Sequence, residues 1–203
     1  MARTSNSAAR RTQIVQALQT VMAKVGYEKA TIQAIAAEAR LAPGLLHYHF
    51  KSKQAILVVL VTTLAGYAQQ RFLQLAGEDT DPVARLRAYI DARLALGPGA
   101  APDIVVAWVM IATEAVRQPE VRDAFGRAVV AELDLLTSLL ADCLRAQRRD
   151  EAPARQLAAG VLAMIEGSYQ LACAAGAVMP SGYAAEAALR YALAQVAPDE
   201  LGR

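Results

Sequence analysis

The stretch at residues 31–50, TIQAIAAEARLAPGLLHYHF, constrains the fold of this chain more than any other. From Ile32 onward, apolar residues recur at i, i+3, i+4 and i+7, which predicts one buried face of a short helix. Thr31 is placed to cap that helix by accepting a hydrogen bond from its first turn. A turn at residues 39–41 follows, and Pro43 suits the first position of a second helix. The stretch therefore predicts two short helices joined by a tight turn.

Two helices of this kind are the usual device for placing a helix in the major groove of DNA. The pair cannot bury its apolar faces alone, so a further helix has to pack against it. A helix over residues 8–25, with Gly26 closing it, supplies that cover. Phe50 is expected in the core of this three-helix head rather than on its surface.

The rest of the chain predicts helices only, because Ala and Leu are abundant and Gly and Pro fall mostly between periodic stretches. We expect an all-α protein of about nine helices. A helix-turn-helix head is expected at residues 1–53 and a larger helical body at residues 54–203. The further helices are expected at residues 52–75, 81–96, 102–117, 119–148, 152–175 and 183–196.

Charge is distributed unevenly along the chain. Residues 1–53 hold eight Lys or Arg against two acids, a formal charge of +6. The whole chain carries +2, which leaves −4 for the other 150 residues. A basic head on an acidic body indicates a head that binds a polyanion, and an ordinary solvated surface with uneven charge is the alternative.

Several classes of protein find little support. No Cys/His cluster has metal-ligand spacing, so neither a metal nor a cofactor is expected. Cys143 and Cys173 lie in apolar helical stretches and are expected to be buried thiols in a reducing compartment. An enzyme would rest on Glu114 and Glu166 alone, so none is expected. No secretory signal and no apolar run of about 18 residues is evident, which favours a cytoplasmic protein without membrane contact.

The stretch from Thr31 to Leu57 resembles the TetR (TetR/AcrR) family of transcriptional repressors. The stretch WVMIATEAVRQPEVRDAF and the later Glu166-Gly167 resemble the branch that includes regulators of betaine synthesis. The residues that carry the family pattern are Thr31, Ile35, Ala36, Gly44, Leu46, His47, Tyr48, His49, Phe50, Ser52 and Lys53.

The resemblance implies a homodimeric, ligand-responsive regulator, most often a repressor, whose two heads enter successive major grooves of a near-palindromic operator and are released by a small-molecule inducer. The second helix lacks a central Arg, Asn or Gln, so Gln33 or Arg40 is expected to supply base contacts instead. Tyr48 or His49 packing on the first helix is the alternative. The resemblance places DNA contacts at Thr31, Gly44, Leu45, His47, Tyr48, His49 and Lys53.

Three positions depart from the family pattern. Arg40 stands where glycine is usual, so a non-glycine residue has to take a positive φ or the turn differs. Ala42 replaces a common capping Ser before Pro43. Leu45 replaces a small or hydroxylated residue that often faces DNA, and its side chain suits contact with a thymine methyl group.

The resemblance also implies that residues 54–203 form a ligand-binding and dimerisation domain, with a dimer interface in the last two helices and a ligand pocket among the middle ones. The interface is expected at Leu157, Val161, Ile165, Ala185, Leu189, Ala192, Leu193 and Val196, with an intramolecular core as the alternative. The pocket is expected at Tyr67, Tyr89, Trp108, Ile111, Glu114, Met164, Tyr169 and Gln170, with ordinary core packing as the alternative. The effector is expected to be apolar, and cationic or rich in donors if Glu114 and Glu166 both face it.

A second function class remains open at this point. The missing capping Ser, Arg40 in the turn and the absence of a base-reading Arg are compatible with a helical small-molecule-binding or scaffolding protein whose head does not bind DNA. Salt-dependent binding to DNA separates the two classes.

Overall fold

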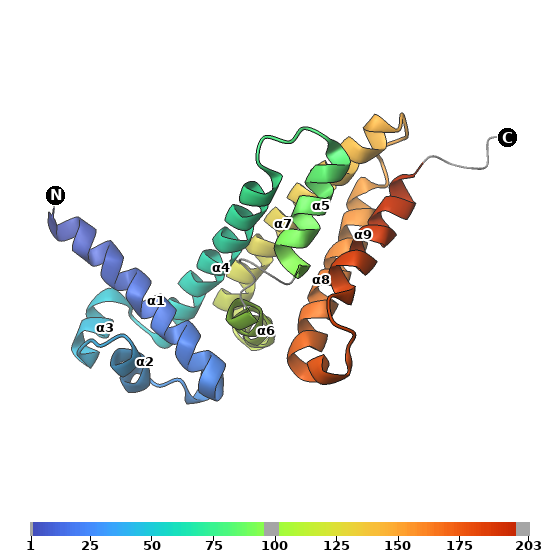
Figure 1. Cartoon of the computed structure of the whole chain (residues 1–203). Helices are drawn as coiled ribbons and strands as arrows, with labels where there is room; N and C mark the ends of the chain where they lie inside the picture. Colours follow the sequence, from blue (N-terminus) through green and yellow to red (C-terminus); the bar gives the residue numbers. More distant parts are fainter. Residues whose placement is uncertain (1, 96–101, 198–203) are drawn as a thin grey trace. The chain divides into compact units, whose positions relative to one another are not determined.

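The computed structural model describes residues 2–95 and 102–197, and every regular element in these ranges is helical (Figure 1). The all-α prediction is therefore confirmed, and each expected helix is present with ends that differ by a few residues. The predicted end of the fifth helix at residue 96 lies outside the described residues. The elements are α1 (Ala2–Lys29), α2 (Ile32–Glu38), α3 (Pro43–His49), α4 (Lys53–Ala76), α5 (Pro82–Leu94), α6 (Pro102–Arg117), α7 (Pro119–Ala146), α8 (Ala154–Ala175), the short 3₁₀ turn η1 (Gly176–Val178) and α9 (Tyr183–Val196).

The chain divides into two compact units. The first unit comprises Met1–Ala65 and Ala101–Ala128, and the second comprises Gly66–Ala100 and Val129–Arg203. This division differs from the expected boundary after residue 53, because α6 packs on α1 and so joins the head. Helices α4 and α7 each begin in the first unit and end in the second.

The three-helix arrangement of the head follows from its apolar stripes. Ile14, Leu18 and Met22 of α1 are fully buried, and Ile35 and Leu46 bring α2 and α3 onto them. Gly26 interrupts α1 with a φ of 80°, a backbone conformation that side chains disfavour. The predicted break of the first helix at this glycine is thus confirmed, and so is the burial of Phe50, which is 5% exposed.

The second unit has its own hydrophobic core, to which α4, α5, α7, α8 and α9 contribute. Helix α9 packs on both α5 and α8. Cys143 lies in this core, and burial raises the pKa of its thiol to about 11. Cys173 is exposed, against expectation, because it lies on a face of α8 that no part of the described chain covers.

Within the described residues, two helical stretches are long and apolar enough to cross a membrane by length and composition, although the sequence showed no unbroken apolar run of that length. They are Lys53–Ala76 and Ala154–Val178. In the most apolar 18-residue part of each, 33% and 11% of the residues are buried, respectively. Length and composition do not distinguish such helices from helices that soluble proteins bury in a core.

Candidate nucleic-acid interface and effector site

The turn between α2 and α3 has the predicted geometry. Thr31 caps α2, because its Oγ1 accepts a hydrogen bond from the Ala34 amide at 3.1 Å. Arg40 takes a φ of 53°, so a non-glycine residue does occupy the left-handed position of the turn. The Leu41 amide donates to the Ala36 carbonyl at 2.9 Å and closes the turn. Backbone hydrogen bonds thus hold α3 at a fixed angle to α2.

Helix α3 presents a polar outer face. Leu46 is buried and anchors the helix, whereas Gly44 and His47 are exposed and Tyr48 is 80% exposed. Tyr48 therefore does not pack on α1, which excludes the alternative for that residue. Ala42, at the N-cap of α3, makes no side-chain hydrogen bond to the first turn of that helix.

Two predicted contact residues of α3 are less accessible. His49 is half-buried, and its ring meets the edge of the Tyr48 ring with centroids 5.0 Å apart. Leu45 is also half-buried. On α2, by contrast, Gln33 is exposed.

Arg11 fixes the end of α3, a role that the sequence did not reveal. Its Nη1 donates to the His49 carbonyl at 2.5 Å, and its guanidinium lies 4.2 Å from the centre of the Phe50 ring. A cation at the carboxyl end of a helix is favourable, because the last carbonyls there lack partners within the helix. The 38 residues that separate Arg11 from His49 leave no local pattern from which the contact follows.

Lys53, an expected DNA contact, makes contacts within the head. Its Nζ donates to the carbonyls of Tyr27 at 2.7 Å and Glu28 at 3.3 Å, and it lies 4.2 Å from the centre of the Tyr27 ring. Burial lowers the pKa of this ammonium group, with Glu114 and Glu28 acting in the opposite direction. Lys53 thus joins the start of α4 to the end of α1.

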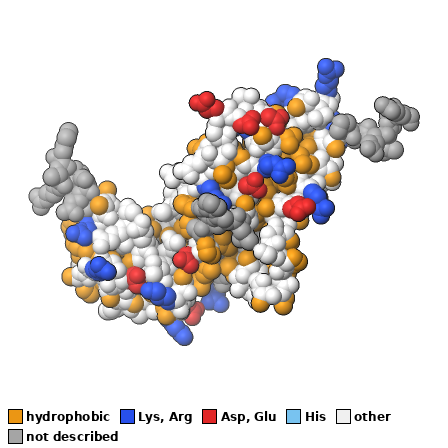
Figure 2. Space-filling view, in the orientation of Figure 1, with side chains coloured by type: hydrophobic (Ala, Val, Ile, Leu, Met, Phe, Trp, Pro, Cys, Tyr) orange, Lys and Arg blue, Asp and Glu red, His pale blue; other side chains and the backbone are white. Residues whose placement is uncertain are grey.

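Several basic side chains on the head are exposed, and Figure 2 shows Lys and Arg on its visible face. Arg40 lies at the turn before α3 and Lys51 lies at the turn after it; both are exposed. Exposed cations at the two ends of a protruding helix suit the phosphates that flank a groove.

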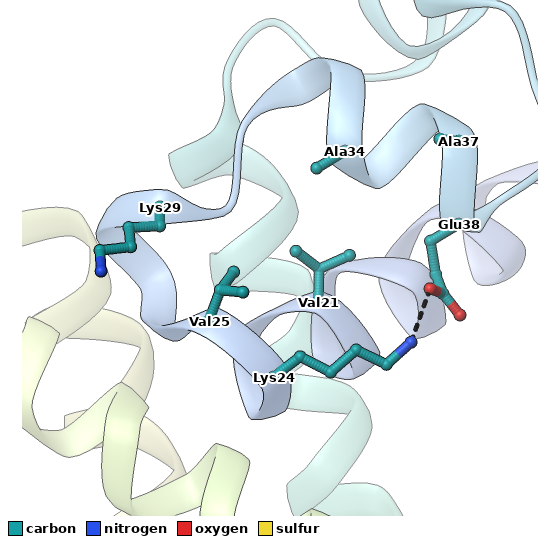
Figure 3. A pocket seen from close by; sticks show the side chains of 7 residues that line it. All are labelled: Val21, Lys24, Val25, Lys29, Ala34, Ala37 and Glu38. Atoms are coloured by element: carbon teal, nitrogen blue, oxygen red, sulfur yellow. Dashed lines mark hydrogen bonds and ion pairs between the residues drawn. The ribbon is translucent and has the colours of Figure 1, made fainter.

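The head also has a shallow groove between α1 and α2 (Figure 3). Its lining is largely apolar, and Lys24 Nζ pairs with Glu38 Oε2 at 3.0 Å at one side. Helix α3 contributes no residue to the lining, so we place no DNA contact in this groove. It is lined by Val21, Lys24, Val25, Lys29, Ala34, Ala37 and Glu38.

In the second unit, a polar cluster interrupts the apolar core. Tyr89 Oη of α5 donates to Glu132 Oε2 of α7 at 2.8 Å, and Arg93 Nη2 pairs with the same oxygen. Tyr169 Oη of α8 donates to the Arg93 carbonyl at 3.1 Å. Burial raises the pKa of both tyrosines, so both are neutral donors at physiological pH.

The sequence analysis placed both Tyr89 and Tyr169 in the predicted pocket lining, but it missed Arg93 and Glu132. A signal was present, because Leu86, Tyr89, Ile90 and Arg93 follow the spacing of one buried helical face. A charged residue on such a stripe indicates a buried ion pair or a ligand contact.

The comparisons with known proteins agree with this geometry. The family model "Bacterial regulatory proteins, tetR family" matches residues 14–60, and "BetI-type transcriptional repressor, C-terminal" matches residues 82–198. The chain belongs to the tetR family. It is therefore a helix-turn-helix transcriptional regulator with a ligand-binding domain of the BetI type, and not an enzyme, as the sequence predicted.

Relatives of this chain include regulators named BetI. This regulator is 31% identical to the HTH-type transcriptional regulator BetI of Rhizobium meliloti over 79% of its own length and 76% of that protein. It is 26% identical to BetI of Paraburkholderia phytofirmans over 90% and 89% of the two chains.

Solved structures of related proteins share the fold. A transcriptional regulator from Pseudomonas aeruginosa superimposes with a TM-score of 0.81 at 15% identity, over 93% of this chain and 91% of that one. A transcriptional regulator from Saccharomonospora viridis, solved in complex with choline, superimposes with a TM-score of 0.79 at 22% identity, over 91% and 95%.

The residues predicted to line the effector pocket of this regulator come from both units. Trp108, Ile111 and Glu114 belong to the first unit, whereas the other five residues belong to the second. Trp108 stacks on Phe125 with centroids 4.8 Å apart, and Glu114 Oε2 accepts a hydrogen bond from Gln118 at 2.7 Å.

Within the second unit, the five predicted lining residues also differ in burial. Tyr89 is fully buried, Tyr67, Met164 and Tyr169 are half-buried, and Gln170 is exposed. Gln170 therefore lies outside the interior of the second unit, because its position on α8 turns away from the core. Tyr89 and Tyr169 remain together in the polar cluster.

The predicted dimer face is the inner face of α8 and α9. Val161, Ile165, Leu189, Ala192 and Val196 are at most 6% exposed in the single chain. The alternative of an intramolecular core therefore holds for these residues, because each helix buries its most apolar stripe in its own unit. The other three, Leu157, Ala185 and Leu193, pack against that core and are partly buried.

Proposed function

We propose that this regulator binds a near-palindromic operator as a homodimer in the cytoplasm and leaves it when a small molecule binds the second unit. The observation that carries the DNA-binding part is the outer face of α3, where Gly44, His47 and the largely exposed Tyr48 protrude between two exposed cations, Arg40 and Lys51. A protruding helix with flanking cations suits a major groove bordered by phosphates.

The individual roles differ along α2 and α3. Arg40, Lys51 and the Tyr48 hydroxyl reach phosphates, which position the head without reading sequence. Gln33 and His47 are placed to contact base edges, and Gly44 lets the backbone approach the DNA closely. Affinity then depends strongly on salt, because most contacts are electrostatic.

A second copy of this chain covers the outer face of α8. Ala159, Ala163, Gly167 and Leu171 recur at intervals of four residues and are exposed, with Leu171 at 41%. Hydrophobic side chains are visible over the region of α8 and α9 in Figure 2. Small residues let helices approach closely, so α8 and α9 of two copies form a four-helix bundle.

The dimer explains both the operator and the response. Two α3 helices contact half-sites about 34–36 Å apart, which requires a near-palindromic operator. A ligand that binds one arrangement of the two units more tightly shifts the population away from the DNA-binding one, by no more than its difference in affinity. Helices α4 and α7 run through both units and connect them.

The test of DNA binding is the substitution Tyr48→Ala. Duplexes selected from a randomised pool supply the operator, and fluorescence anisotropy measures affinity at several salt concentrations. We expect Tyr48→Ala to weaken operator binding by about tenfold with little change in stability, because its side chain is exposed. The control is Val25→Ala, which truncates an exposed side chain in the α1–α2 groove. Equal affinity of Tyr48→Ala and wild type contradicts the proposed interface.

A second candidate is a small-molecule-binding protein whose head does not bind DNA. The observation that favours it is the uncapped α3, which lacks Arg, Asn and Gln. Failure of the selection to enrich any duplex, together with no salt-dependent binding to genomic fragments, supports this candidate over the regulator.

A further inference from the structure

Arg93 is a charged residue in the core of the second unit. Its side chain is 6% exposed, and it lies in the last turn of α5 on the face that carries the buried Leu86 and Ile90. Burying a charge is costly unless hydrogen bonds and an opposite charge compensate for the lost water. The groups around Arg93 therefore show which partners its buried charge has and which it needs.

Most polar groups around Arg93 are engaged. Nη2 pairs with Glu132 Oε2, which also accepts the Tyr89 hydroxyl hydrogen bond at 2.8 Å. The guanidinium lies 4.9 Å from the centre of the Tyr89 ring, and the Arg93 carbonyl accepts the Tyr169 hydroxyl hydrogen bond at 3.1 Å. Glu132 of α7 and the Tyr89 ring of α5 thus hold the guanidinium, and Tyr169 of α8 bonds to the backbone of the same residue.

One donor in the cluster has no partner. Arg93 Nη1 is buried and makes no hydrogen bond within the described part of the chain. A buried donor without an acceptor is unfavourable, and native proteins supply nearly all such groups with a partner. The cluster is therefore complete only when an acceptor oxygen reaches Nη1.

The charges of the cluster determine which ligand fits. A quaternary ammonium group binds where aromatic faces and a carboxylate are open to it. Here Arg93 already occupies the Tyr89 ring and neutralises Glu132. A second cation would be repelled by the guanidinium, whereas a carboxylate or amide oxygen would receive a hydrogen bond from it.

We propose that Arg93 Nη1 is the recognition point for the effector, and that the effector presents the oxygen of a carboxylate or a neutral carbonyl group and carries no positive charge. The proposal rests on the proposed ligand-responsive function and specifies its ligand class. It differs from the expectation of a cationic or donor-rich effector, which was conditional on Glu114 and Glu166 both facing the ligand.

The experiment compares matched ligands on the full-length protein. The probes are butyrate, hexanoate and octanoate, their primary amides, the butyl-, hexyl- and octyltrimethylammonium ions, and choline. Isothermal titration calorimetry and thermal shift measure binding. We expect members of the carboxylate or amide series to bind and the ammonium ions not to bind, and the preferred series identifies the charge of the acceptor group.

The variant Arg93→Lys keeps the positive charge beside Glu132 but lacks the second donor of the guanidinium plane. We expect it to bind the preferred probe roughly 10- to 100-fold more weakly, the loss of one charge-assisted hydrogen bond. The matched control is Arg87→Lys, which lies on the same helix with an exposed side chain and should bind as wild type does. If Arg93→Lys does not fold, Arg93→Gln combined with Glu132→Gln removes the ion pair without leaving a buried charge.

Three results overturn the proposal: binding of choline or an alkyltrimethylammonium ion in preference to the oxygen-bearing probes, wild-type affinity in the Arg93 variants, or binding of no carboxylate or amide. Operator affinity of the ligand-free protein separates this failure from failure of the proposed function. Arg93→Lys should leave it unchanged, and a wild-type protein that binds no DNA contradicts the regulatory function whichever probe it binds.

Discussion

Arg40 holds a left-handed backbone conformation in the turn that sets the angle between α2 and α3, with a φ of 53°. A residue with a Cβ pays roughly 1 kcal/mol for this conformation, which glycine adopts freely. The exposed guanidinium at this turn lies beside the proposed DNA-binding face. A contact between the Arg40 guanidinium and a DNA phosphate would offset this conformational cost.

The substitution Arg40→Gly separates these two effects. We expect it to raise the free energy of unfolding by about 0.5–1 kcal/mol in urea denaturation, and to weaken operator binding by several-fold because a phosphate contact is lost. The control is Arg148→Gly, since Arg148 also has a positive φ of 56° but follows α7 in the second unit. That variant should be stabilised without losing DNA affinity. Unchanged operator affinity in Arg40→Gly would exclude the phosphate contact.

Among the helices, the junction between α1 and α4 illustrates how one side chain joins two elements. Carbonyls in the last turn of a helix have few backbone partners, and Lys53 at the first position of α4 donates to those of Tyr27 and Glu28. The Tyr27 carbonyl also accepts a hydrogen bond from the Ala30 amide at 3.1 Å. Further contacts in the first unit tie α6 and α7 to the same region, with Arg117 paired to Glu28 at 3.2 Å and Gln54 bonded to Glu120 at 2.9 Å. The first unit is thus held together by helix ends as well as by its core.

Lysines on either side of Ser52 should therefore behave differently. We expect Lys53→Met to lower the free energy of unfolding by about 1–2 kcal/mol, because two carbonyls lose a charged donor. Lys51→Met should leave stability within about 0.5 kcal/mol of wild type and weaken operator binding, since its side chain is exposed. Urea denaturation and anisotropy on both variants provide the measurement. If Lys53→Met instead weakened operator binding and left stability unchanged, Lys53 would be a DNA contact.

At the scale of the whole molecule, we expect the outer face of α8 to determine the oligomeric state. The inner stripe of this helix is buried in its own unit, and the outer stripe of Ala and Gly remains uncovered within the described residues. On the side of α8 that faces α9, Gly160 makes room for the Tyr191 ring, since a Cβ added there would lie 3.0 Å from Tyr191 Oη. On the outer side of α8, the small residues let a helix of a second copy pack closely.

The substitution Gly167→Arg tests this interface. A charged side chain buried without a partner disrupts an interface, so we expect the dimer to dissociate at micromolar concentration in sedimentation equilibrium, with loss of tight operator binding. Ala131→Arg places the same charge on an exposed position of α7 and should remain dimeric. If Gly167→Arg dimerises as strongly as wild type, the outer face of α8 is not the dimer interface.

The sequence by itself determined the helices, the turn and the family. Thr31, Gly26 and Pro43 act through their immediate neighbours, so helix ends follow from local chemistry. Only the tertiary structure decided which face of α8 is inner, that Lys53 caps α1, that Arg11 caps α3, and that Arg93 meets Glu132. These contacts join residues far apart in the chain, and periodicity identifies an apolar stripe without identifying what covers it. The most apolar stripes of α8 and α9 therefore form the core, whereas the stripe of small residues on the outer face of α8 is exposed in the single chain.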